Sequence, residues 1–348
     1  MYDMLGKYYS CRLRPNKLKK KLKTGYRMPD VTKSIKLPRV ACVQRMIKPV
    51  RSIDGYIDMV DCFARKAYES GCDLLVFPEY NFFDLLGLIP CFSLIDRLLS
   101  RPSKEKAAMV KADDEGAGLY PVFLSIAVPV QNAIESIMCS IARVYGIYIY
   151  TGTYPVKKGN ALYNSGSLVS REGEILGRQH KIHLTEHEDR IGFGRTDVLN
   201  SFDTDFGKIA IPVCMDATYF EIFKKAYDSG CDIVVLPIAN SEEYNVYRAI
   251  RGIWSRVQEN YVFGLKSALT GSVAGIHFTG KAGVFAPMEM TERKNGIVAV
   301  SKHWEGNELV IADLDIASLV KLRQEAEYFG DRNELFEREY NKRTYVRG

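Results

Sequence analysis

The sequence feature that most constrains the fold is a repeated eight-residue segment. KAYESGCD at 66–73 returns as KAYDSGCD at 225–232. In both copies a helix pattern ends at a glycine, a residue that tolerates positive φ after a helix. An apolar strand pattern follows each glycine, LLVF or IVVL, and ends at Pro78 or Pro237. Each copy therefore predicts a helix-turn-strand unit, and the chain is expected to contain two similar halves.

Strand and helix patterns alternate around both copies, which favours an α/β fold. The expected strands are 39–44, 73–77, 208–213, 261–267, 283–286, 297–300 and 309–312, and the expected helices are 53–70, 219–229 and 248–259. Strands that are apolar almost throughout are typically buried on both faces. We therefore predict a four-layer α-β-β-α sandwich of two mixed β-sheets with the helices outside.

Charge divides the chain into three expected parts: a basic N-terminal extension (1–36), an α/β domain (37–335) and a charged C-terminal tail (336–348). Residues 1–39 carry 12 Lys and Arg against two Asp, so the other residues have a net charge of −4 out of the total of +6. A mildly acidic body argues against nucleic-acid binding. The KLKKKLK segment at 17–23 leaves open a peripheral contact with an anionic membrane, and a solvated or subunit-clasping arm is the alternative.

Composition favours an ordinary globular protein, because 47% of the residues are hydrophobic and 26% are charged. Uninterrupted apolar stretches are shorter than the roughly 18 residues of a membrane-spanning helix, and a secretory signal is not evident. We therefore expect a cytoplasmic protein. The eight cysteines show no CxxC pair and no zinc-site spacing, so no metal and no cofactor are expected. The long stretch 88–118 is a candidate lid.

Three polar residues follow apolar strand patterns: Glu79, Lys181 and Cys214. Ligands of α/β folds bind beyond the carboxyl ends of strands. A thiol nucleophile needs a base, its attack on a carbonyl creates an oxyanion, and the leaving amine needs a proton. Glu79 can act as base and Cys214 as nucleophile, while Lys181 and the N–H of Met215 can hold the oxyanion. A helix directly after Cys214 would also lower the thiol pKa.

Other side chains of this region receive less specific expectations. His180, His183 and His187 could supply a Cys-His dyad or a metal site, but structural hydrogen bonding is the preferred interpretation. We expect the wall of the substrate pocket to contain Tyr80, Asn81, Tyr219 and His277. The acidic pair Glu242 and Glu243 gives a weak indication of a cationic amine in the substrate.

The strings DLLVFPE, GRQHKIHLTEHE and GKIAIPVCMDATYFE resemble the three signature segments of the nitrilase superfamily of carbon-nitrogen hydrolases. The resemblance covers roughly 38–335 and keeps the order Glu, Lys, Cys. It implies the same three catalytic residues and a second acid, Glu188, near the lysine, with Glu186 as the competing choice. It also implies structural roles for Asp216 and Glu221 near the nucleophile.

This resemblance implies hydrolysis of an amide or carbamoyl carbon-nitrogen bond in a small molecule, through a cysteine thioester, by a homodimer or higher homo-oligomer. Nitrile hydrolysis, acyl transfer to an amine and a catalytically silent binding role stay open as alternatives. The second half looks closest to bacterial nitrilase-like amidohydrolase domains of the type sometimes fused to acetyltransferases. Phe220 departs from the family pattern, in which a proline commonly starts the helix after the cysteine.

Overall fold

The computed structural model describes residues 2–14, 37–100, 119–326, 333 and 335–336. Its 13 strands form one hydrogen-bonded network with the order β5-β4-β3-β2-β1-β9-β8-β7-β6, and β10 to β13 lie off this path. The strands are β1 (Arg39–Met46), β2 (Leu74–Val76), β3 (Tyr148–Lys158), β4 (Ala161–Val169), β5 (Ile175–His180), β6 (Ser201–Thr204), β7 (Gly207–Ala210), β8 (Ile233–Ile238), β9 (Phe263–Val273), β10 (Ile276–Phe278), β11 (Gly283–Phe285), β12 (Ile297–Val300) and β13 (Glu308–Asp313).

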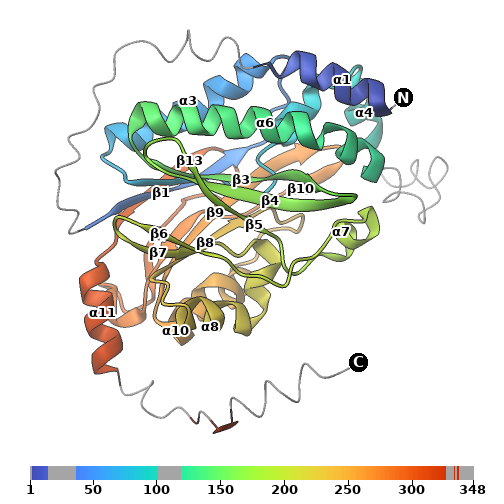
Figure 1. Cartoon of the computed structure of the whole chain (residues 1–348). Helices are drawn as coiled ribbons and strands as arrows, with labels where there is room; N and C mark the ends of the chain where they lie inside the picture. The colour runs from blue at the N-terminus through green and yellow to red at the C-terminus, as the bar shows by residue number, and fades with distance from the viewer. Residues whose placement is uncertain (1, 15–36, 101–118, 327–332, 334, 337–348) are drawn as a thin grey trace.

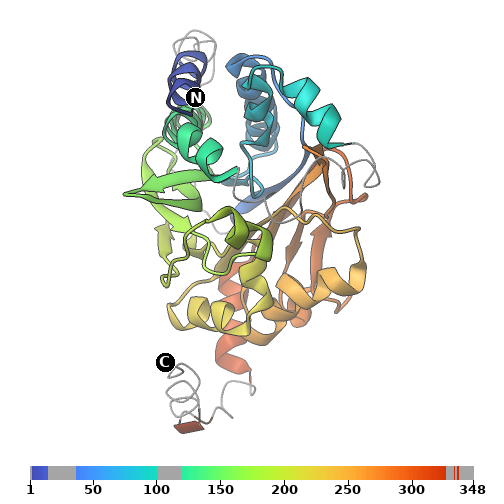
Figure 2. The same cartoon turned by 90° about the vertical axis from the view of Figure 1, so that its right-hand side faces the viewer.

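Helices cover both outer faces of the strands, with α3 and α6 on one side and α8 and α10 on the other (Figures 1 and 2). The helices are α1 (Tyr2–Arg12), α3 (Ile53–Glu69), α4 (Phe92–Leu99), α6 (Leu119–Tyr145), α7 (Glu186–Ile191), α8 (Phe220–Asp228), α9 (Val246–Ala249), α10 (Ser255–Asn260) and α11 (Ile316–Glu325). Short turns are η2 (Phe83–Leu88), η3 (Cys214–Thr218), η4 (Ile250–Trp254) and η5 (Met288–Met290).

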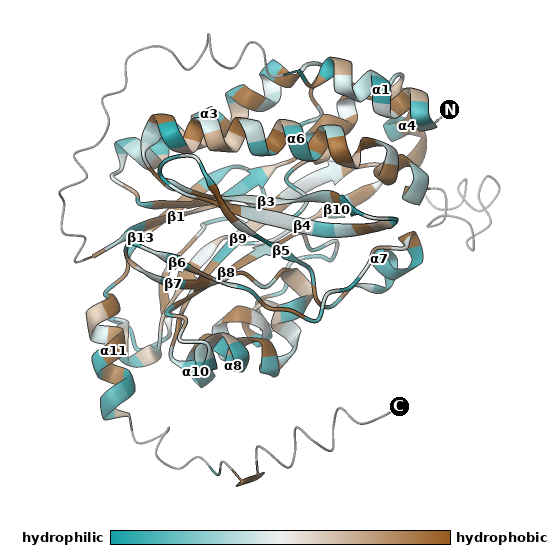
Figure 3. Cartoon of the chain, viewed as in Figure 1, coloured by the Kyte–Doolittle hydropathy of each residue, from teal (hydrophilic) through white to brown (hydrophobic). Residues whose placement is uncertain are grey.

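Three hydrophobic clusters separate the four layers. Successive residues of a strand point to opposite faces, so Val40 packs between the two sheets and its neighbour Ala41 packs under α3 and α6. In the second half, Ile233 lies between the sheets and Val234 packs against α8 and α10. Figure 3 shows hydrophobic residues along the strands between the layers. The predicted α-β-β-α sandwich is thereby confirmed.

Both halves of the network are mixed sheets. In the first half β1, β2 and β3 run parallel, β4 is antiparallel to β3, and β5 is antiparallel to β4. In the second half β7, β8 and β9 run parallel, β6 is antiparallel to β7, and β11 is antiparallel to β9. The halves join where β1 pairs with β9, in the register Gln44 to Ala268.

The repeated sequence segment forms the same turn twice. Helices α3 and α8 are each followed by a serine C-cap and then by Gly71 or Gly230, with φ of 73° and 76°. A Cβ at either glycine would meet no atom within 4 Å. The backbone angle, and not the available space, therefore explains the glycine in both copies.

The aspartate at the end of each copy of the repeated segment connects neighbouring parts of its half through hydrogen bonds. Asp73 Oδ1 accepts a hydrogen bond of 2.8 Å from Arg171, and Asp232 Oδ1 accepts one of 2.9 Å from Arg323. Each second carboxylate oxygen accepts a backbone N–H from the beginning of the preceding strand. These N–H donors belong to Arg39 in β1 and Lys208 in β7. The repeat therefore fixes the helix-to-strand turn and also the neighbouring strand.

The first residues of the expected N-terminal extension belong to the folded body. Helix α1 packs along α6, where Tyr9 and Leu13 are buried in the first hydrophobic cluster. The hydroxyl of Tyr9 donates a 2.9 Å hydrogen bond to the carbonyl of Leu85. The basic segment 17–23, like most of the expected tail at 336–348, lies outside the described residues.

Helix α6 was not predicted from the sequence. By length and composition alone it could cross a membrane, with a mean hydropathy of 1.5 over 18 residues. Its buried residues, however, pack in the cluster that α3 and the first sheet share, as is usual for a core helix. Of the candidate lid, 88–100 contains the end of η2 and α4, and 101–118 lie outside the described residues.

The predicted helix 248–259 is interrupted, because Gly252 has the non-helical angles φ −85° and ψ −120°. The segment therefore divides into α9, η4 and α10. A glycine inside a helix pattern weakens the helix, and the sequence pattern alone did not locate this break.

We expect Gly230→Ala to destabilise the protein by about 1 kcal/mol, because the left-handed backbone conformation is strained for alanine, whereas glycine adopts it freely. Urea unfolding of the two proteins, followed by fluorescence, measures this difference. Gly230→Asn is the matched variant and should lose less, since asparagine tolerates the left-handed region. Equal losses for both variants would show that the backbone angle is not the cause.

Candidate active site

The three polar residues that follow strand patterns all lie just beyond carboxyl ends of strands. Glu79 follows β2, Lys181 directly follows β5 and Cys214 follows the segment after β7. Glu79 and Cys214 come from different halves of the sandwich, since β2 and β7 are separated by β1, β9 and β8 in the strand order, yet Glu79 lies close enough to Cys214 to influence its pKa. The fold therefore gathers residues that are 135 positions apart in the sequence.

A buried ammonium lies between two buried carboxylates. The Nζ atom of Lys181 is 2.8 Å from Glu79 Oε1 and 2.8 Å from Glu188 Oε2. All three side chains are at most 2% exposed. Two carboxylates around one ammonium leave a net negative charge, and such a buried group needs further hydrogen-bond donors.

Asn164 in β4 supplies donors that the sequence analysis did not identify. Its Nδ2 atom donates to Glu79 Oε1 and to Glu188 Oε1, at 2.9 Å each. Its backbone carbonyl accepts the N–H of Lys181 at 2.9 Å. The only sequence signal for this residue is an amide in the strand segment ALYNSGSLV.

Glu188, and not Glu186, is the second acid of the cluster. Glu188 is the third residue of α7, where its side chain and Thr185 form a reciprocal capping box. The Tyr80 hydroxyl also donates to Glu188 Oε1. Glu186 points outward and pairs with Arg190 on the surface. The helix start therefore directs one carboxylate inward and the other into solvent.

Cys214 begins the tight turn η3 and has a left-handed backbone, with φ of 47°. Asp216, which is fully buried, holds this turn through its carboxylate. It accepts the N–H of Val213 at 2.8 Å and the N–H of His183 at 2.6 Å. Because His183 lies two residues after Lys181, Asp216 connects the thiol turn to the segment that carries the lysine.

The surroundings of the Cys214 thiol favour its protonated form. Burial and the neighbouring Glu79 carboxylate raise the pKa of Cys214, although Lys181 opposes them. This result contradicts the expectation that a helix dipole would lower that pKa. η3 is a five-residue turn, and α8 begins only at Phe220, so no long helix starts at the thiol.

The two carboxyl groups respond differently to burial. Burial raises the pKa of Glu79 above its usual value of 4.5, although Lys181 acts in the opposite direction. Burial also acts on Glu188, but the charge of Lys181 and the donors around it hold the Glu188 pKa below its usual range. For Lys181, burial alone would lower the pKa, but Glu79 and Cys214 raise it overall. Of the two carboxylates, Glu79 is thus the one that more readily takes up a proton.

Two of the four expected wall residues lie beside this cluster. Tyr80 bonds to Glu188 and stacks on Phe83, with ring centres 4.8 Å apart. Tyr219 directly follows η3, is 40% exposed, and stacks on His183 with ring centres 3.8 Å apart. Both aromatic side chains are therefore held next to the residues that surround Cys214.

The structure does not place Asn81 or His277 in such a wall. Asn81 is fully buried, and its side chain binds Arg45, a buried cation that the sequence analysis missed. This contact anchors the segment after Glu79. His277 is exposed on β10 and pairs with Glu305 at 3.0 Å. Residue type and position near a motif suggested both, but the direction of each side chain depends on tertiary packing.

The remaining polar candidates have separate partners. His180 packs on Tyr163, and His183 binds Asp216. Glu242 pairs with Arg248 on the surface, which weakens its suggested role toward a cationic substrate. Within the described segments, no three His, Cys, Asp or Glu side chains are grouped in a way that could hold a metal ion.

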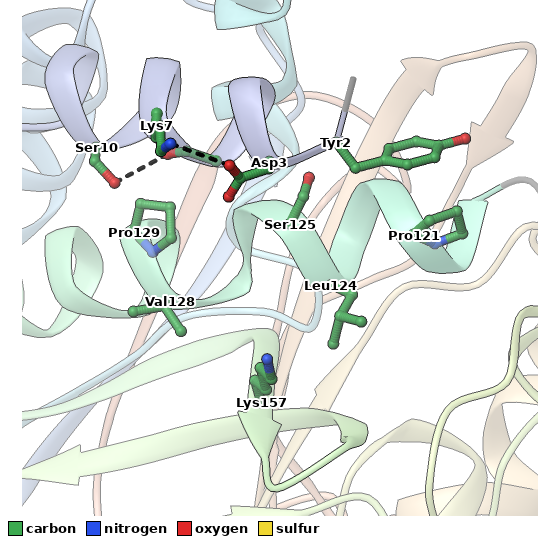
Figure 4. A pocket seen from close by; sticks show the side chains of 11 residues that line it. Tyr2, Asp3, Lys7, Ser10, Pro121, Leu124, Ser125, Val128, Pro129 and Lys157 are labelled. Carbon is green, nitrogen blue, oxygen red and sulfur yellow. Dashed lines mark hydrogen bonds and ion pairs between the residues drawn. The ribbon is translucent and has the colours of Figure 1, made fainter.

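A separate groove of about 460 Å³ lies between α1 and α6. Figure 4 shows its lining, which includes Asp3, Lys7 and Leu124 together with Lys157 from β3. None of the residues predicted for the site lines this groove. The groove therefore does not belong to the Cys214 cluster.

Comparison with known proteins gives one family over most of the chain. Residues 39–324 match the family model described as carbon-nitrogen hydrolase. A probable hydrolase of Bacillus subtilis, YhcX, is 25% identical over 292 residues, which are 82% of this chain. The match covers 51% of YhcX, so the chain spans about half the length of this relative. A nitrilase of Pyrococcus abyssi is 26% identical over 68% of this chain and 92% of its own length.

Solved structures show the same fold. An amidase from Nesterenkonia sp. AN1, described as a member of the nitrilase superfamily, superposes with a TM-score of 0.63. The match covers 89% of this chain and 99% of the amidase, at 20% sequence identity. At this identity the likeness concerns the fold alone.

We expect Asp216→Ala to reduce the free energy of unfolding by about 3 kcal/mol, because several buried N–H groups lose their acceptor. Urea unfolding measures the loss. Asp216→Asn keeps one acceptor oxygen and should be less harmful. If both variants were as stable as the original protein, Asp216 would not be the group that holds the thiol turn.

Proposed function

The chain belongs to the carbon-nitrogen hydrolase family of the nitrilase superfamily, and from this premise we propose that it hydrolyses an amide of a small molecule through a cysteine thioester. One observation carries the proposal. The Glu79 carboxylate is 2.8 Å from the Lys181 ammonium and lies close enough to Cys214 for each group to influence the pKa of the other, while the thiol itself donates to Asn240 Oδ1 at 3.5 Å. A base, a nucleophile and a cation for the oxyanion are thus grouped in one site.

In the first half of the reaction, Cys214 Sγ attacks the amide carbon while its proton passes to Glu79. The carbonyl oxygen becomes an oxyanion, which the Lys181 ammonium and the N–H of Met215 stabilise. The carbon-nitrogen bond then breaks, and the proton on Glu79 passes to the leaving nitrogen. The products of this half are an amine, or ammonia, and an acyl-thioester at Cys214.

In the second half, water attacks the thioester and gives its proton to Glu79. The carbon-sulfur bond breaks, the thiolate takes the proton back from Glu79, and a carboxylic acid leaves. Glu79 must therefore act alternately as base and acid. Its pKa, raised by burial, suits this alternation better than that of an exposed glutamate.

The two carboxylate oxygens of Glu79 have different hydrogen-bond partners, and this difference supports different roles for them in the proposed reaction. Oε1 accepts hydrogen bonds from Lys181 and Asn164, while Oε2 accepts the backbone N–H of Ala239 at 3.1 Å. The Ala239 amide also lies within hydrogen-bonding reach of the Cys214 sulfur. We assign Oε2 as the oxygen that exchanges the proton, since it has fewer donors and shares the Ala239 amide with the thiol.

The amidase with this fold gives a chemical parallel. In one solved structure of the Nesterenkonia amidase, the acetamide moiety of fluoroacetamide is covalently attached to the active-site cysteine. We propose the corresponding covalent role for Cys214. A screen of small amides and of the matching nitriles, with product analysis, would identify the acyl group that this chain accepts.

We expect Cys214→Ala to reduce turnover of any amide found by this screen at least about a thousandfold, because no nucleophile remains. Intact-protein mass spectrometry should show an acyl adduct on the unchanged protein and none on the variant. Cys62→Ala removes another half-buried thiol and should keep full activity. Full turnover by Cys214→Ala would exclude the proposed mechanism.

The pH dependence of kcat/KM should show an acidic limb centred above 4.5. Glu79 must be ionised to accept the thiol proton, and its pKa is raised, so activity falls at higher pH than for an ordinary glutamate. Steady-state rates across the acidic range measure the limb. Glu186→Gln removes only a surface carboxylate and should leave it unchanged. A limb centred at or below 4.5 would show that Glu79 is not the base.

A further inference from the structure

Four polar groups of the site form a closed ring. Lys181 Nζ and Asn164 Nδ2 each contact both Glu79 and Glu188, at distances of 2.8 to 2.9 Å. The lysine brings a charge to this ring, whereas Asn164 brings only two N–H bonds. The two carboxylates are thus bridged twice, once by an ammonium and once by a neutral amide.

The charge balance shows why the amide bridge matters. One ammonium cannot neutralise two carboxylates, and like charges in one buried site favour protonation of one of them. Hydrogen bonds to an ionised carboxylate favour its ionised form. Asn164 donates one such bond to each carboxylate, so it opposes that protonation without adding charge.

The orientation of the Asn164 amide is fixed by the same contacts. Reversing the amide would place its oxygen against the oxygens of Glu79 and Glu188, which can accept but not donate when ionised. In the observed orientation, Oδ1 is buried and has no hydrogen-bond partner among the described residues. An unpaired buried acceptor is unfavourable for folding. The contacts made by Nδ2 therefore determine the orientation of the side chain, even though Oδ1 is left unpaired.

We propose that Asn164 is a positioning residue that keeps Glu79 ionised and aligned, so that Glu79 can take the proton of Cys214. Asn164 acts through Glu79 and is not required to touch the substrate. Its backbone carbonyl accepts the N–H of Lys181 and so holds the lysine next to the same two carboxylates. This inference rests on the proposed function only for the hydrolysis measurement, because thiol reactivity can be measured without a substrate.

The test is the pH dependence of Cys214 alkylation by iodoacetamide, with the modified peptide quantified by mass spectrometry. Loss of the Asn164 donors should make the Glu79 and Cys214 pair lose its first proton at higher pH. We expect Asn164→Ala to raise the pH of half-maximal alkylation by about one pH unit. Asn164→Ser keeps one donor and should give a smaller increase, and it replaces the alanine variant if that variant does not fold.

Two controls separate positioning from general destabilisation. The exposed Cys11 and Cys91 in the same samples should react with unchanged pH dependence. Asn260→Ala removes another buried asparagine side chain, which donates to the carbonyl of Arg256. This variant should lower the melting temperature without moving the alkylation profile of Cys214.

Hydrolysis gives the second measurement. We expect Asn164→Ala to lower kcat at least about tenfold, to change KM little, and to move the acidic limb of kcat/KM upward by the same amount as alkylation. An unchanged alkylation profile in Asn164→Ala would overturn the role of Asn164. If the original protein hydrolysed no amide while the alkylation profile still moved, the proposed function would fail and the role of Asn164 would stand.

Discussion

The site depends on one electrostatic constraint, the burial of Lys181 between Glu79 and Glu188. Removing three charges from water is costly unless each charge is paired and hydrogen-bonded. The protein meets this cost with donors from three separate elements: Asn164 in β4, Tyr80 after β2 and the capping box at Thr185. The resulting network places a carboxylate whose pKa is raised by burial near a thiol whose pKa is raised as well. In the proposed mechanism, the reactivity of the thiol depends on this carboxylate.

The two halves of the sandwich supply different parts of this arrangement. The first half supplies the charged ring, and the second supplies Cys214 with the Ala239 amide. Asp216 makes the connection, since one carboxylate holds both the thiol turn and the segment after Lys181. The backbone of Cys214 is left-handed, a conformation that a non-glycine residue adopts at a cost, and Asp216 helps to maintain it.

The sequence predicted the layered arrangement and the position of three polar residues after strands. The repeated segment predicted two helix-turn-strand units, and the structure shows both, with Gly71 and Gly230 in the same conformation. The family resemblance also favoured Glu188 over Glu186, and the structure brings Glu188 into the cluster. These features are local, because strand ends and helix starts determine which way such side chains point.

Residues fixed by tertiary packing were not predicted. Asn164 and Arg45 are polar residues in strands, and only the packed structure shows that each serves a carboxylate or an amide from a distant segment. Asn81 was misassigned for the same reason, because its side chain turns inward to Arg45. The thiol pKa was misjudged as well. A helix after Cys214 was expected, but the direction of the shift is decided by burial and by the charge of Glu79.

The division of the site between two halves has a consequence for when the site forms during folding. Glu79, Lys181 and Glu188 all precede β6 in the sequence, whereas Cys214 follows it. In a chain whose two sheets have not packed together, Cys214 is therefore apart from Glu79, Lys181 and Glu188. The complete cluster exists only after the second half of the chain has folded against the first, so formation of the site reports that both halves have assembled.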